Sequence, residues 1–277
     1  MNGVSTTGAV SSIAARVPSR IISAALLAVA VLAVGVMRVP ALANDEHVVI
    51  ADNFQGLTLD TGRWNPAVGP HLPHSEDTSL PTQDKVSDGL HLTFQRIQPT
   101  NVYLSGEIYS VASFLYGHVD VIARLPHANG MVPGIWLENF DARGAINGEI
   151  DILEGFGSRP YNFQSTVHHW THGTEPPPSC IQVGWVTPGS LCTNPSKLPV
   201  QDYSAAFHDF GMDWEPGKVT FLMDGVPYWT CTKGIPSTPM DLVLGLAVGY
   251  FWDGYPDAST PNSASFDVQS VRVTSAN

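Results

Sequence analysis

Residues Gly148–Gly155 read G-E-I-D-I-L-E-G, and this stretch decides the expected fold because it sets three acids among β-favouring aliphatic residues. Side chains alternate along a strand, so Glu149 and Asp151 share a face while Glu154 would point the other way. One β-bulge near Ile152–Leu153 would reset the alternation and bring all three acids to one face. The stretch therefore predicts a bulged strand with three carboxylates on one side.

Like charges on one strand repel each other and gain little from packing, so the three carboxylates do not stabilise the strand. Their presence together therefore indicates acid–base chemistry. With the bulge counted out, Glu149 and Glu154 lie about four steps apart, or roughly 13 Å along a strand. Side chains that lean inward would leave the two carboxyls ~5 Å apart, as in retaining rather than inverting glycosidases. Ile150 and one of Ile152 or Leu153 would fill the buried face. For the octapeptide alone, a solvated acidic strand face is the alternative.

The octapeptide resembles the active-site strand of glycoside hydrolase family 16, in the bulged E-x-D-x-x-E form of bacterial laminarinases and lichenases. Other segments resemble the family's motifs in the same order, from about residue 52 to residue 273. They are D-N-F (52–54), L-D-T-G-R-W-N (59–65), S-G-E-I (105–108), F-L-Y-G-H-V-D (114–120), G-I-W-L (134–137), F-H (207–208), W-E-P-G (214–217), D-G (224–225) and V-Q-S-V-R-V (268–273). The resemblance implies an all-β fold, a β-jelly-roll sandwich of two curved antiparallel sheets of the concanavalin A-like lectin/glucanase type.

Composition agrees with this fold class. The chain has 25 Gly and 22 Pro, and its short apolar runs lie between turn signals, without the pattern of a long amphipathic helix. We expect strands at 47–51, 89–95, 106–110, 117–125, 134–137, 149–154, 164–169, 208–214, 219–223, 241–248 and 265–273. Long loops are expected at 65–85 and 172–204.

The resemblance also assigns roles to the acids: Glu149 as the nucleophile, Glu154 as the general acid/base and Asp151 as the supporting acid between them. The chemistry agrees, because Glu149 must be ionised to attack while Glu154 must hold a proton for the leaving sugar. Negative charge on Glu149 and Asp151 would raise the pKa of Glu154. His168 matches the family's histidine beside the catalytic acids, with a purely structural histidine as the alternative. No cofactor is expected for catalysis.

Two tryptophans are candidates for the sugar groove that the resemblance places on the concave face. Trp136 and Trp252 match family positions, and indole rings stack on the apolar faces of sugars, although each would also fit a core position. Asp267 fits the place of an acid that holds a structural calcium in many family members, as a single identified ligand. The family's W-P-A-F-W reads V-P-G-I-W here, without the first tryptophan, so the linkage that is cleaved stays open.

The resemblance implies an endo-acting retaining hydrolase of a β-linked polysaccharide, with β-1,3- or β-1,3-1,4-glucan as the expected substrate. A depolymerase or transglycosylase of an exopolysaccharide or galactan, within the same family, is one alternative. A non-catalytic, lectin-like glycan-binding protein is another, because fold does not dictate function. The intact acid triad favours an enzyme, since a pure binder would not need it.

Residues 1–43 are expected to form a signal peptide and residues 44–277 the catalytic domain. Arg16 and Arg20 precede an apolar run at 21–37, and A-L-A at 41–43 is a suitable cleavage site. An uncleaved anchor is the alternative, because the run is only slightly short for a membrane span. We expect a secreted or periplasmic monomer with no stable membrane partner once the signal is removed.

Charge and cysteines fit an exported glycan-acting protein. After residue 43 the chain has 10 basic and 25 acidic side chains, which argues against nucleic acid as a partner. Cys180 and Cys192 flank a Pro/Gly-rich loop and are the expected disulfide pair, while a bridge from Cys231 to either of them stays open.

Overall fold

The computed structural model describes residues 46–70, 75–100, 102–140, 146–169, 181–183, 201–249 and 253–276. All of these residues belong to one unit that spans residues 43–277. In these ranges the structure has no helix long and apolar enough to cross a membrane. The predicted signal peptide, the Cys180–Cys192 pair and Trp252 lie outside the described residues.

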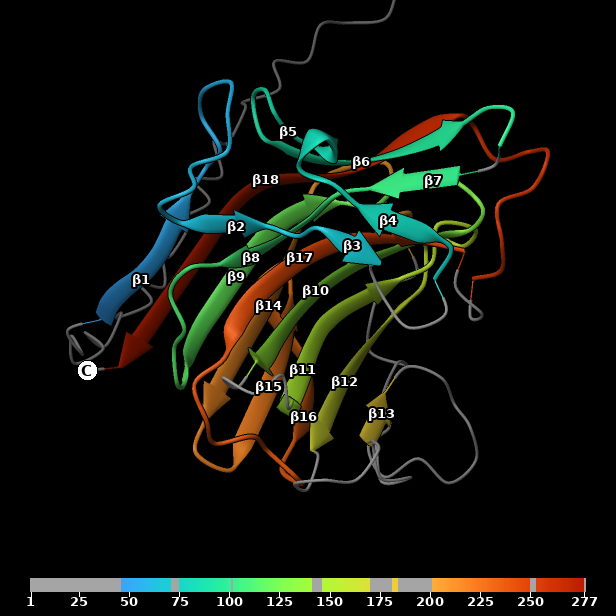
Figure 1. Cartoon of the computed structure of the whole chain (residues 1–277). Coiled ribbons are helices and arrows are strands. Elements are labelled where there is room, and N and C mark those ends of the chain that lie inside the picture. The colour runs from blue at the N-terminus through green and yellow to red at the C-terminus, as the bar shows by residue number, and fades with distance from the viewer. Residues whose placement is uncertain are drawn as a thin grey trace, which may run out of the picture. The chain divides into compact units, whose positions relative to one another are not determined.

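The described strands form two sheets, whose strands bend along their length (Figure 1). The larger sheet has 11 strands among these residues and follows the order β16-β15-β14-β9-β18-β6-β7-β4-β3, with β1 paired to β18 and β5 to β6. Its members are β1 (Glu46–Asp52), β3 (Gly69–Pro70), β4 (Asp77–Ser79), β5 (Asp84–Val86), β6 (Leu90–Ile97), β7 (Val102–Ser105), β9 (Gly117–Arg124), β14 (His208–Glu215), β15 (Lys218–Met223), β16 (Val226–Cys231) and β18 (Ser263–Ala276).

The smaller sheet has seven strands in the described part of the chain, in the order β13-β12-β11-β10-β17-β8-β2. They are β2 (Trp64–Pro66), β8 (Glu107–Ser110), β10 (Met131–Phe140), β11 (Ile146–Gly155), β12 (Phe163–His169), β13 (Ile181–Val183) and β17 (Asp241–Val248). Its pairings are all antiparallel, and in the larger sheet only β4 with β7 is parallel. A 3-10 turn, η1 (Pro81–Gln83), precedes β5.

A hydrophobic core lies between the inner faces of the two sheets. Buried and more exposed residues alternate along β9 and β15, as expected for strands with one face in a core. The inward side chains include Val121 of β9, Phe221 of β15 and Leu244 of β17, all fully buried. The predicted two-sheet, all-β architecture is therefore confirmed.

The strands expected from sequence are present, but both regions predicted as long loops also contain strands. The stretch 65–85 contains β3, β4, η1 and parts of β2 and β5, so the prediction of one long loop there is wrong. Strands β7 and β16 were not predicted. The expected loop at 172–204 lies mostly outside the described residues, and the part that is described holds β13.

Candidate active site

The predicted bulge in β11 is present. Between Asp151 and Glu154, β11 advances three residues while its partner β12 advances only two, from Thr166 to Gln164. The Ser165 hydroxyl donates a 2.6 Å hydrogen bond to the carbonyl oxygen of Ile152. This bond gives a backbone acceptor inside the bulge a hydrogen-bond partner.

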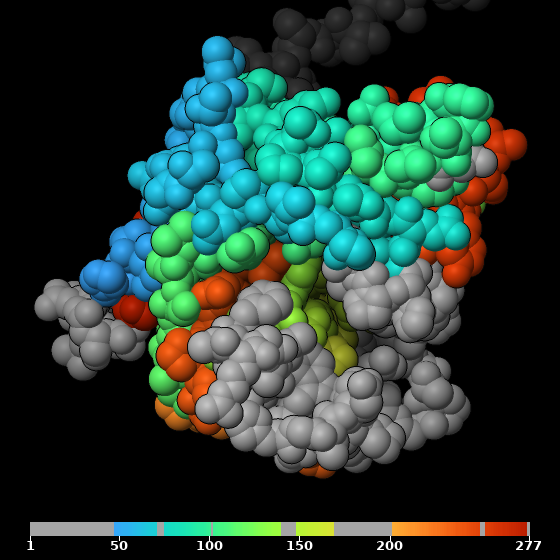
Figure 2. All heavy atoms as spheres, in the orientation of Figure 1, coloured from blue at the N-terminus to red at the C-terminus, as the bar shows by residue number. Residues whose placement is uncertain are grey.

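The bulge separates the aliphatic residues of β11 from its acids. Ile150, Ile152 and Leu153 are all buried in the core, so both bulge residues face inward rather than one of them. Glu149 and Glu154 are half-buried, and they lie with Asp151 on the side of the sheet away from the core. In the space-filling view this side shows a hollow, with yellow-green atoms of β11 and β12 at its floor (Figure 2).

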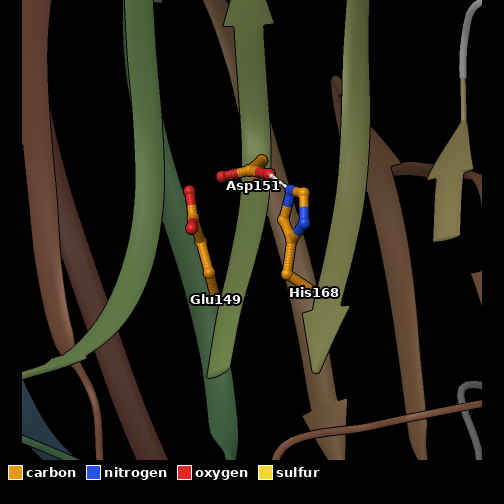
Figure 3. A group of neighbouring side chains, drawn as sticks. All are labelled: Glu149, Asp151 and His168. Carbon is orange, nitrogen blue, oxygen red and sulfur yellow. Dashed lines mark ion pairs between the residues drawn. The ribbon is translucent and has the colours of Figure 1, made fainter. Parts of the chain in front are cut away.

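Glu149, Asp151 and His168 form one cluster on β11 and β12 (Figure 3). Glu149 is paired directly with His168 across the two strands, and the His168 Nε2 atom lies 3.0 Å from Asp151 Oδ2. One ligand atom from each of the three side chains lies within 4.8 Å of the others, so this group could also hold a metal ion. The structure thus brings His168 to the acids, as predicted, while its role stays a prediction.

The Asp151 carboxyl is an immediate neighbour of the Glu149 carboxyl. Burial and the charge of Asp151 raise the pKa of Glu149 well above its ordinary value, against the opposing effect of His168. A hydrogen bond between the two carboxyls raises the pKa of Glu149 further. Asp151 therefore both orients the Glu149 carboxyl and disfavours its ionised form.

The surroundings of Glu154 raise its pKa and supply hydrogen-bond donors, as a general acid requires. Burial and the charge of Asp151 raise its pKa to about 8, although hydrogen bonds from neighbours favour its ionised form. These neighbours are Gln164, whose Nε2 lies 2.7 Å from Glu154 Oε2, and Thr166, whose Oγ1 lies 3.1 Å from the same atom. Glu154 therefore keeps its proton at neutral pH and has two donors ready for the carboxylate that forms when it gives the proton away.

The structure places Trp136 on the same face and adds an acid that the sequence analysis missed. Trp136 is paired with Asp151 across β10 and β11, and its Nε1 donates a 3.0 Å hydrogen bond to Glu138 Oε2. Glu138 is 8% exposed and is paired directly with Glu149. Its position two residues after Trp136 was the available signal, because such residues share a face of a strand.

Asp267 does not have the surroundings of a calcium ligand. Its carboxylate lies 2.7 Å from Arg124 Nη2 and 2.7 Å from His91 Nδ1, and it accepts a hydrogen bond from Ser265. Calcium sites are built from several oxygen ligands, whereas the neighbours of this carboxylate are a guanidinium and an imidazole, which supply nitrogen. The prediction of a structural calcium at Asp267 does not fit these residues.

Comparisons with known proteins agree with this geometry. A model of the glycosyl hydrolases family 16 matches residues 74–268. The chain is 27% identical to the glucan endo-1,3-beta-glucosidase A1 of Niallia circulans, over 87% of this chain and 39% of that protein. It is 30% identical to the glucan endo-1,3-beta-glucosidase of Cryptopygus antarcticus, over 58% of this chain and 61% of that protein. The chain thus spans less than two thirds of either relative.

A solved structure extends the likeness to the fold. The endo-beta-1,3-glucanase from Pyrococcus furiosus matches with a TM-score of 0.69 and 26% identity, over 83% of this chain and 94% of that one. The predicted jelly-roll sandwich is therefore confirmed. With the bulged acidic strand in place and a family model that covers most of the sequence, the chain belongs to glycosyl hydrolases family 16.

Proposed function

We propose that this protein is a retaining endo-hydrolase of β-linked glucan that acts on β-1,3 or mixed β-1,3-1,4 linkages. The observation that carries the proposal is the bulge in β11, which puts Glu149, Asp151 and Glu154 on one open face of the sheet. The two relatives named above, both glucan endo-1,3-beta-glucosidases, support the choice of linkage.

In the first step, Glu154 gives its proton to the glycosidic oxygen while the Glu149 carboxylate attacks the anomeric carbon. The bond between that carbon and the glycosidic oxygen breaks, the shortened chain leaves as an alcohol, and a covalent glycosyl ester forms on Glu149. Asp151 orients the Glu149 carboxyl through the hydrogen bond between them. Gln164 and Thr166 stabilise the negative charge that appears on Glu154.

In the second step, ionised Glu154 takes a proton from water, and the resulting hydroxide oxygen attacks the same anomeric carbon. The ester bond to Glu149 breaks, and Glu154 regains its proton. Two inversions at one carbon leave the sugar with its original β configuration. Trp136, partly exposed beside the acids, provides an apolar surface for a sugar ring.

The test is the release of reducing ends from laminarin and from mixed-linkage β-glucan, with agarose and carrageenan as comparison substrates. We expect oligosaccharides from at least one glucan, a first-formed product with β configuration by proton NMR, and no release by Glu149→Gln. Release from agarose or carrageenan alone would contradict the glucan assignment. Binding without release would indicate a lectin-like protein, and products longer than the substrate would indicate a transglycosylase.

A further inference from the structure

Glu138 extends the site by one strand beyond the motif. Strand pairing aligns Asp241 of β17, Glu138 of β10, Glu149 of β11 and His168 of β12 in one row across four neighbouring strands. Directly paired residues have Cβ atoms about 4.5–5.5 Å apart and point to the same side of the sheet. Glu138 therefore lies on the open face, immediately beside the proposed nucleophile.

The Trp136 ring reaches from Gly134 to Glu138 along β10. A Cβ atom added to Gly134 would lie only 3.1 Å from Cζ3 and 3.2 Å from Cε3 of the indole, so the benzene edge rests over this glycine. At the opposite edge, the indole N–H donates its hydrogen bond to Glu138. The ring thus contacts one neighbour on β10 at each of its two edges.

An ionised Glu138 is unfavourable for the stability of the fold. Burial raises its pKa to about 7 despite the hydrogen bond from Trp136, and the charges of Asp151, Glu107 and Asp241 raise it further. At neutral pH an ionised carboxylate here is poorly solvated and repelled by other acids. A leucine would avoid both costs, so stability alone does not explain the glutamate.

We propose that Glu138 is a positioning residue, which fixes the Trp136 ring through the indole hydrogen bond as the platform for the sugar that lies beside Glu149. This inference rests on the proposed function, because it assumes that a glycan occupies the hollow beside Glu149. Glu138 acts through Trp136, and its contribution is to substrate binding rather than to proton transfer.

The first test is a double-mutant cycle with Trp136→Ala, Glu138→Leu and the double variant, assayed on the glucan that the wild type hydrolyses. We expect Glu138→Leu to raise KM about tenfold with a smaller change in kcat, as for a lost stacking contact. In the Trp136→Ala background, Glu138→Leu should have no further effect, because the two residues act as a unit. Equal effects in both backgrounds would overturn the proposal.

Glu138→Gln separates the hydrogen bond from the charge. The amide oxygen of glutamine can still accept the indole hydrogen bond, so this variant should keep KM within about threefold of the wild type. A Glu138→Gln variant as poor as Glu138→Leu would contradict the positioning role. Glu215→Gln, at an exposed acid on β14 in the other sheet, is the matched control and should leave KM unchanged.

Two further measurements do not depend on the substrate. The indole N–H resonance of Trp136, assigned by its loss in Trp136→Phe, should move in Glu138→Leu and stay near its wild-type position in Glu138→Gln. The melting temperature of Glu138→Leu should equal or exceed that of the wild type, whereas a merely structural role predicts a decrease. An unmoved resonance would overturn the inference, while a wild type inactive on every glucan would instead overturn the proposed function.

Discussion

Each sheet has a row of directly paired residues that includes an acid, but the rows differ in how far basic side chains offset its negative charge. In the larger sheet, Asp267 of β18 is paired directly with His91 of β6 and Arg124 of β9, and both side chains bind its carboxylate. In the smaller sheet, Glu138 and Glu149 are paired directly with each other. His168 continues this second row on β12, and its Nε2 atom lies 3.0 Å from Asp151 Oδ2.

The pKa shifts follow this difference. Burial works against the charge of Asp267, yet hydrogen bonds from Arg124, His91 and Ser265 outweigh it and hold the pKa below its usual range. Burial and like charges raise the pKa of Glu149 and of Glu154 instead. Compensated charge stabilises the fold, whereas uncompensated charge costs stability and keeps protons available for chemistry.

The largest effect is expected for Glu149→Gln, which removes the proposed nucleophile. We expect kcat on glucan to fall by ~10⁴-fold or more, the scale seen when a nucleophile is deleted. The folded-state pKa of Glu149 is raised, so its contribution to stability is lost as the pH rises, and an ionised Glu149 destabilises the fold at neutral pH. The variant should therefore melt at or above the wild-type temperature, as measured by circular dichroism. A lower melting temperature would contradict the assignment of uncompensated charge to this row.

Glu154→Gln should reduce kcat on unactivated glucan by about 10²–10⁴-fold, because the leaving oxygen loses its proton donor. In the wild type, the rate should fall above about pH 8, where Glu154 ionises. The variant should not show this alkaline fall in its residual activity. The measurement is the pH dependence of kcat/KM for both proteins, and an alkaline limb that survives the substitution would assign the limb to another group.

The sequence predicts the long strands and the bulge because their signals are local. Alternating apolar residues give β9 and β15, and the odd spacing between Asp151 and Glu154 requires the bulge in β11. Strands β3 and β4 are only two and three residues long and lack such alternation. They exist because neighbouring strands provide hydrogen-bond partners, and that information lies elsewhere in the chain.

The site divides in the same way. Glu149, Asp151 and Glu154 lie within one strand, so their shared face follows from spacing alone. Glu138 could be recognised only from the register between β10 and β11, which places it opposite Glu149. The partners of Asp267 are 176 and 143 residues away in sequence. Only the pairing of β18 with β6 and β9 shows that His91 and Arg124, rather than a calcium ion, lie beside this carboxylate.

Asp267→Asn should break the compensated row and lower the free energy of unfolding by about 1–2 kcal/mol, at the modest end for a buried ion pair because Arg124 is partly exposed. Urea titration measures this loss, and kcat per folded molecule should not change. Asp213→Asn, at a more exposed acid of the same sheet, is the comparison variant. Stabilisation of the wild type by added calcium, absent in Asp267→Asn, would restore the calcium site that these residues do not fit.

The smallest effect is the pH dependence that His91 gives to the same row. Burial lowers the pKa of His91, but hydrogen bonds to Asp267 and to the Ser87 carbonyl, with the charge of Asp267, outweigh it and raise the pKa above its usual value. A histidine with a raised folded-state pKa stabilises the fold below about pH 6.5, and this contribution is lost as the pH rises through the folded value. The difference in unfolding free energy between wild type and His91→Gln should therefore be larger at about pH 5.5 than at about pH 9. Because the other titrating groups are common to both proteins, they cancel in this difference.

In the Asp267→Asn background the pH dependence of the difference should disappear, since the carboxylate that favours the charged imidazole is gone. A difference that persisted there would mean that His91 is held by the Ser87 carbonyl alone, and that the row in the larger sheet is compensated by Arg124 rather than by both cations.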